Sequence, residues 1–129
     1  MQQHGWFIAY VAVNALIVTL LALNVSRNRI RLRVANGDGG LLEMKAAIRA
    51  HGNAVEHMTV FGFVMLALSL SAAAPALQAI LVVMFTLGRL MHAASMLRSA
   101  FNLRRAAAAL VYLAEVGGCV ALLLVLLRG

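Results

Sequence analysis

The sequence has few of the residues that small water-soluble domains rely on. Only 12% of its 129 residues are charged, with four acidic residues against eleven Lys and Arg. Its single cysteine, Cys119, excludes an intrachain disulfide and a cysteine-rich metal site, and leaves the redox compartment open. In contrast, 64% of the residues are hydrophobic, where soluble domains have about 45–50%. A soluble chain this small could not bury so much apolar surface, so the composition predicts an integral membrane protein with one domain, residues 1–129.

Four apolar segments account for this composition. A membrane-spanning helix needs roughly 17–25 mainly apolar residues, and none of the segments shows the alternation of a barrel strand. The sequence therefore predicts an all-α fold, an integral membrane bundle of four transmembrane helices. The second and third segments reach full length only by including polar residues at one end. The spans are expected at about 5–25, 54–74, 76–96 and 106–127.

The ends of the segments carry local signals. The first segment has no basic stretch before it and no small-residue cleavage site after it, which favours a retained span over a removed signal peptide. Pro75 fits the first turn of the third helix, so residues 71–75 are expected to form a short hairpin turn. Glycines within 37–40 interrupt the chain, and Asp38 is a candidate N-cap for a second helix that begins near Leu41.

The basic residues indicate an orientation. Most lie between the first and second segments or between the third and fourth: Arg27, Arg29, Arg31, Arg33, Lys45, Arg49, Arg89, Arg98, Arg104 and Arg105, against Arg128 alone on the other side. Because cytoplasmic loops are enriched in Lys and Arg, both loops are expected in the cytoplasm and both termini outside it. Orientation, together with attraction to anionic lipid headgroups, explains the net charge of +7 without nucleic acid.

Polar residues gather at one level of this predicted bundle. Arg49, Asn53 and Glu56 share one face of the second helix at spacings i, i+4 and i+7, and Arg89 and His92 share a face of the third. A charged side chain inside a span costs roughly 2.5–3.5 kcal/mol, so these groups should face the bundle interior or a wet cavity. The pattern predicts a cationic pocket with one carboxylate, suited to an anionic ligand. Alternatively the residues only join helices, with Glu56 paired to Arg89.

Three motifs resemble one known family. Residues 48–57 (IRAHGNAVEH) look like the signature of the MAPEG family, the membrane-associated proteins in eicosanoid and glutathione metabolism. Residues 88–92 (GRLMH) resemble its third-helix motif, and residues 31–33 (RLR) followed by 37–40 (GDGG) resemble the first loop of its bacterial branch. The resemblance extends over essentially the whole chain.

The resemblance implies a homotrimer in the bacterial inner membrane with glutathione, as co-substrate, held between protomers near the cytoplasmic face. It implies a transferase or peroxidase acting on a lipophilic small molecule, with membrane lipids and other copies of the chain as partners. No metal is expected, because the histidines show no convincing ligand geometry with a carboxylate. Arginines would hold the glutathione carboxylates and Glu56 its amine. Arg105 or Arg31 would stabilise the thiolate. The matching positions are Arg31, Arg49, Asn53, Glu56, Arg89, His92 and Arg105; the role of Arg89 could be structural.

The chain also departs from the family pattern. Met96, Ala106 and Ala109 stand where catalytic members often carry hydroxyl residues, which leaves glutathione binding expected but thiolate activation in question. A non-catalytic binding or structural membrane protein is therefore an alternative. A small four-span exporter is a third hypothesis, and it would need a carboxylate deep in the membrane.

Glu115 is the deep carboxylate that the motifs do not explain. It lies ten residues after Arg105, or roughly 15 Å along a helix at 1.5 Å per residue. Because a lipid-facing carboxylate is costly, its side chain is expected to point into the bundle or a trimer interface. We expect it to be protonated or hydrogen-bonded to Asn14 or Ser69, with a proton-relay site as the alternative.

Overall fold

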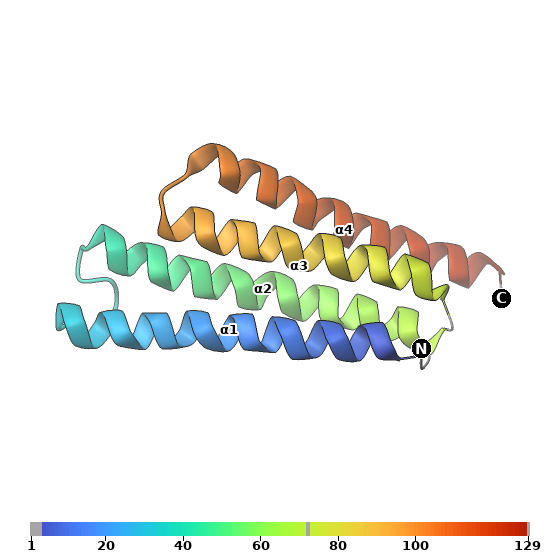
Figure 1. The fold of residues 1–129 in the computed structure, drawn as a ribbon, viewed down its shortest axis with the longest axis horizontal. Helices are drawn as coiled ribbons and strands as arrows, with labels where there is room; N and C mark the ends of the chain where they lie inside the picture. Colours follow the sequence, from blue (N-terminus) through green and yellow to red (C-terminus); the bar gives the residue numbers. More distant parts are fainter. Residues whose placement is uncertain (1–3, 72, 129) are drawn as a thin grey trace.

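The chain folds into four antiparallel helices (Figure 1). The computed structural model describes residues 4–71 and 73–128. The helices are α1 (Gly5–Leu32), α2 (Leu42–Leu70), α3 (Pro75–Leu97) and α4 (Phe101–Arg128). Each is long and apolar enough to cross a membrane. The predicted all-α, four-span architecture is therefore confirmed.

Helices α2 and α3 form the centre of the bundle. Each of them packs against the other and against both α1 and α4, whereas α1 and α4 do not touch one another within the described residues. Phe61 of α2 stacks on Phe85 of α3 with ring centroids 4.2 Å apart. Tyr10 of α1 meets both rings edge-on, at 5.5 and 5.7 Å. This aromatic cluster joins three helices, so α4 must be held by other contacts.

Glycines bring α4 close to its neighbours. A Cβ added at Gly88 of α3 would lie 2.8 Å from Val111 Cγ2, and one added at Gly118 of α4 would lie 2.6 Å from Val64 Cγ1. Small residues allow such close helix contact in membranes, where no hydrophobic driving force brings the helices together. The two positions therefore fix the distance of α4 from α3 and α2.

The turn between α2 and α3 lies where it was predicted. Pro75 occupies the first turn of α3, where a missing N–H costs nothing. The range predicted at 54–74 runs past the end of the second helix, however, because α2 ends at Leu70. The backbone N–H of Ala73 already bonds the Leu68 carbonyl, which closes the helix end before the proline.

The role predicted for Asp38 is wrong. Its side-chain oxygen Oδ1 accepts a hydrogen bond from the Gly40 N–H at 2.9 Å, so it stabilises the loop. Helix α2 begins at Leu42, and its N-cap residue is Leu41, which makes no side-chain cap. The glycines allow this loop because Gly37, Gly39 and Gly40 all adopt positive φ. Asp38 is thus three residues too early to cap the helix.

The helices differ in length at the loop end of the bundle. Helices α1 and α2 have 28 and 29 residues, or about 42–44 Å at 1.5 Å per residue, against a hydrocarbon core of about 30 Å. Helix α3 has 23 residues. Figure 1 shows that the α1–α2 loop extends beyond the α3–α4 turn, so the two hairpins form a step.

Candidate functional site

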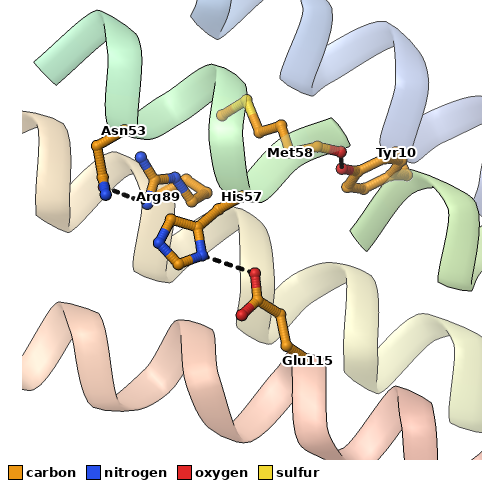
Figure 2. A network of polar contacts seen from close by, with 6 residues as sticks. All are labelled: Tyr10, Asn53, His57, Met58, Arg89 and Glu115. Carbon is orange, nitrogen blue, oxygen red and sulfur yellow. Dashed lines mark hydrogen bonds and ion pairs between the residues drawn. The ribbon is translucent and has the colours of Figure 1, made fainter. Parts of the chain in front are cut away.

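The contact between Asn53 and Arg89 is the centre of the candidate site. Asn53 lies on α2 and Arg89 on α3, and Arg89 Nη1 donates a hydrogen bond to Asn53 Oδ1 at 3.0 Å (Figure 2). An alanine, Ala54, follows Asn53 and is fully buried, so α2 approaches α3 closely here. The structure thus brings together two of the residues that the sequence assigned to one pocket.

Arg89 is buried to an unusual degree for a guanidinium. Only 1% of its surface is exposed, and Nε and Nη2 have no hydrogen-bond partner among the described residues. His92, one turn further along α3, is also buried, and its Nδ1 is likewise without a partner there. A buried polar group without a hydrogen bond is costly. A small polar molecule beside Arg89 and His92 could form the missing hydrogen bonds.

A small cavity of about 20 Å³ lies beside these groups. This is enough for about one water molecule. Its lining residues come from three helices and include both predicted and unpredicted site residues: Asn53, His57, Arg89, His92, Ala108, Val111 and Tyr112. Asn53 and His92 therefore line the same cavity, as expected if they belong to one pocket.

His57 and Glu115 form a second polar contact in the same region. His57 Nδ1 of α2 lies 2.8 Å from Glu115 Oε1 of α4 (Figure 2). Both side chains are about one-fifth exposed, at 20% and 18%. The Tyr112 ring lies beside the imidazole, 5.6 Å between centroids. Glu115 therefore points into the bundle, as predicted.

The predicted partners of Glu115 are wrong. Asn14 donates instead to the Tyr10 carbonyl and to Thr86 Oγ1, and Ser69 donates to the Leu66 carbonyl. The sequence leaves the role of His57 open, because a histidine among other polar residues can either line a pocket or be hydrogen-bonded within the bundle. A usable signal is that Glu115 is a deep carboxylate on α4, and oppositely charged groups in a membrane tend to pair, so a basic residue at the same depth on a neighbouring helix is its expected partner.

Glu56 does not pair with Arg89, contrary to one sequence-based alternative. Glu56 is exposed on α2 and takes part in no ion pair within residues 4–71 and 73–128. Glu56 immediately precedes His57, so its side chain points about 100° away from that of His57 around the helix axis. Asn53, and not Glu56, accepts the hydrogen bond from Arg89, and the Glu56 carboxylate is exposed on the surface of the described bundle.

Two of the predicted site arginines line open clefts at the loop end. Arg49 lies in a cleft of about 390 Å³ with Lys45, Met96 and Arg104. Arg31 lies in a second cleft of about 630 Å³, where it pairs with Glu43 and donates to Asn28 Oδ1 at 3.0 Å. Both volumes are within the usual range for small-molecule sites, and both clefts present cationic groups.

Arg105 is separate from these groups. It is exposed at the start of α4, with its guanidinium carbon 5.9 Å from the centre of the Phe101 ring, a cation–π distance. Within this single chain the seven predicted site residues therefore do not form one pocket. Three belong to the cluster around the small cavity, two line the open clefts, and two lie exposed outside both. The cluster contains Asn53, Arg89 and His92; the clefts contain Arg49 and Arg31; Glu56 and Arg105 are exposed.

This arrangement is suited to anion binding. Its cations lie at the loop end, and its buried polar groups lie next to them inside the bundle. No group of three or more His, Cys, Asp and Glu that could hold a metal ion occurs in the part of the chain that the structure describes. The arginines of the clefts can form charge-assisted hydrogen bonds to carboxylates.

Comparison with known proteins supports the motif-based resemblance. The model of the MAPEG family matches residues 7–126. The inner membrane protein YecN of Escherichia coli, strain K12, is 39% identical over 83 residues, and YecN of Escherichia coli O6:H1 shows the same identity. These matches cover 64% of this chain and 63% of the relatives' length. No solved structure matches the chain.

Proposed function

Because the chain belongs to the MAPEG family, we propose that it binds glutathione and transfers it to lipophilic electrophiles, or uses it to reduce lipophilic peroxides. Binding would occur between protomers of a homotrimer, near the cytoplasmic face. The residues involved would be Arg31, Arg49, Asn53, Glu56, Arg89, His92 and Arg105.

The observation that carries this proposal is the exposure of Glu56 on an apolar helix. Glu56 lies fourteen residues before Leu70, the end of α2, or about 21 Å along the axis. This depth is inside a hydrocarbon core of about 30 Å, where a lipid-facing carboxylate is costly. A neighbouring protomer and a ligand amine would together cover it, which supports both self-association and a binding site at the interface.

The division of the site residues also supports a site between protomers. The buried pair of Arg89 and Asn53 fixes α3 against α2, and so orients the exposed face of α2. Arg49 and Glu56 are exposed on that helix. They present one positive and one negative group about ten ångströms apart along it, which matches a ligand with carboxylates and an amine. Arg31 or Arg105 of a neighbour would then complete the anion site.

The location and orientation are part of the same proposal. The relatives are named inner membrane proteins, and we place this chain in the inner membrane as a multi-pass protein with both termini outside the cytoplasm. The excess of arginine at the two loops supports this orientation.

A non-catalytic binding protein is the second candidate, because Met96, Ala106 and Ala109 offer no hydroxyl to a thiolate. The deciding experiment is glutathione titration of the purified protein in nanodiscs, followed by conjugation and peroxidase assays with apolar substrates. Saturable binding with turnover supports the enzyme. Saturable binding without turnover supports the second candidate as a glutathione-binding protein. No binding at millimolar glutathione contradicts the enzyme and favours the second candidate as a structural membrane protein. The exporter hypothesis would gain from proton-coupled transport that depends on Glu115.

A further inference from the structure

The His57–Glu115 pair has no place in the proposed glutathione contacts, yet it adjoins them. His57 lies one helical turn from Asn53 on α2, and both line the cavity that also contacts His92. Asn53 and His92 are proposed ligand contacts. The cavity therefore lies between two proposed glutathione contacts, Asn53 and His92, and the imidazole of His57, which in turn contacts Glu115 (Figure 2).

We propose that the His57–Glu115 pair accepts the proton that bound glutathione loses when its thiol ionises. This inference rests on the proposed function. In the step, the S–H bond breaks and its electron pair stays on sulfur. The proton passes through the cavity to the imidazole of His57, which becomes an imidazolium hydrogen-bonded to the Glu115 carboxylate. Atoms and charge balance without any other reactant.

The geometry supplies each part of this path. The cavity holds about one water molecule by volume, and it is lined by the buried groups that lack partners among the described residues, Arg89 and His92. His57 Nδ1 is already bonded to Glu115 Oε1 at 2.8 Å, which leaves Nε2 as the nitrogen available to accept a proton. The carboxylate then stabilises the imidazolium directly.

Charge balance inside the membrane explains why the proton would stay. Transfer of the proton from the thiol to His57 moves one positive charge within the buried region and adds none. If the proton left for water, the buried region would become more negative by one charge, which is expensive in a low-dielectric interior. Transfer to His57 keeps the total unchanged.

The other titratable groups around His57 do not replace this acceptor. From α1, Tyr10 donates its hydroxyl to the Met58 carbonyl. From α3, Arg89 and His92 face the same cavity, and Arg89 is a cation that cannot accept a proton. From α4, Tyr112 lies beside the imidazole. His92 has no carboxylate within salt-bridge distance among the described residues, so an imidazolium there would be less stabilised than at His57.

The test counts protons and thiolates together. The trimer or protomer in nanodiscs is titrated with glutathione in buffers of different ionisation enthalpy, and thiolate formation is followed by ultraviolet absorbance. We expect the wild type to release far less than one proton per thiolate. Glu115→Gln should raise the protons released per thiolate roughly twofold or more, because the retained proton has lost its carboxylate. His57→Gln, which keeps a donor to Glu115, should do the same if Glu115→Gln does not fold.

The controls separate this proposal from the proposed function. S-methylglutathione has no ionisable thiol, so it should give no difference between variants. Asp38→Asn removes a loop carboxylate while keeping the acceptor that bonds Gly40, and it should behave as wild type. Full proton release by the wild type, unchanged in Glu115→Gln, would overturn the acceptor role while leaving glutathione binding intact. Absence of glutathione binding would overturn the proposed function and remove the proton donor with it.

Discussion

His57 and Glu115 lie 58 positions apart in the chain, and their side chains meet between α2 and α4 at 2.8 Å. This polar contact joins α4 to α2. Since α4 does not touch α1 and lies outside the aromatic cluster, the pair should matter for how α4 packs.

Substitutions at Glu115 should separate hydrogen bonding from charge. Glu115→Gln keeps the size and a hydrogen-bonding oxygen, so folding and assembly should be retained. Glu115→Leu leaves the His57 imidazole without its partner, which typically costs about 1–3 kcal/mol. Size-exclusion chromatography and thermal unfolding in detergent should show loss of stability for Leu only. Equal stability of Leu and wild type would contradict a structural role for the pair.

Asn53→Ala should destabilise the protein through Arg89. The substitution removes the acceptor of the Arg89 Nη1 hydrogen bond and leaves the guanidinium with fewer partners in an apolar bundle. A hydrogen bond to a charged group contributes about 1.5–3 kcal/mol, so the unfolding temperature in detergent should fall clearly. Asn53→Asp is the matched variant, because it keeps an oxygen acceptor and adds a compensating charge. An unchanged unfolding temperature in the Ala variant would show that Arg89 does not depend on Asn53.

Arg49→Ala and Glu56→Ala should weaken glutathione binding without unfolding the protomer, since both side chains are exposed. Loss of a charge-assisted partner costs about 1.5–3 kcal/mol, or roughly ten- to a hundredfold in Kd. Isothermal titration in nanodiscs measures this effect. Arg98→Ala is the control, because Arg98 is an exposed cation at the end of α3 that lines neither cleft. Equally weakened glutathione binding in all three variants would contradict specific contacts by Arg49 and Glu56 and would indicate a general effect of surface charge.

Two glycine substitutions should act in opposite directions. Gly88→Ala would place its Cβ 2.8 Å from Val111 Cγ2 and 3.3 Å from the Ala107 carbonyl oxygen, and overpacking typically costs about 1–3 kcal/mol. Gly52→Ala has nothing within 4 Å of the new Cβ, and the change inside a helix favours folding by about 0.5–1 kcal/mol. Thermal unfolding of the two variants compares them directly. A higher unfolding temperature for Gly88→Ala would contradict the close packing of α3 and α4, and a lower one for Gly52→Ala would mean that another protomer occupies that space.

Reporter fusions test the proposed orientation. Fusions after Ala35, Ala74 and Leu103 should report the cytoplasm, the outside and the cytoplasm in turn, because the arginines cluster around the first and third positions. Alkaline phosphatase and a fluorescent protein give complementary readings. A cytoplasmic reading at Ala74 would reverse the orientation and move the proposed site to the other face.

The sequence predicted the helices better than their partners. Long apolar runs and Pro75 located the four spans because hydropathy and a missing N–H act locally. Helix ends were less accurate, as Asp38 and Leu70 show, since helix ends fray and their last turns are irregular, so that local sequence fixes them only within a few residues. The expected order of the spans puts Asn53, Arg89 and His92 at one level of the bundle, and in the structure all three line one cavity.

Contacts between helices could not be read from spacing within one helix. Periodicity assigns a residue to a face, but not the rotation of that face toward a given neighbour. This is why Glu56 was considered for Arg89 when Asn53 occupies that position, and why Glu115 was assigned to Asn14 or Ser69 when His57 lies opposite. Both errors concern side chains whose partner is on another helix and more than thirty residues away.

The step between the two hairpins has a consequence for how molecules of different solubility reach the site. Helices α1 and α2 extend beyond the α3–α4 turn (Figure 1), and the clefts containing Arg31 and Arg49 open beside that turn. Water can therefore follow the shorter hairpin inward to the level of Met96 and Ser99, which line those clefts. A water-soluble ligand would enter through these clefts, and a lipophilic molecule would reach the same region from the lipid, along the apolar helix faces. Water in the clefts and lipid at the outer helix faces would thus meet near the α3–α4 turn, because α3 is shorter than α1 and α2.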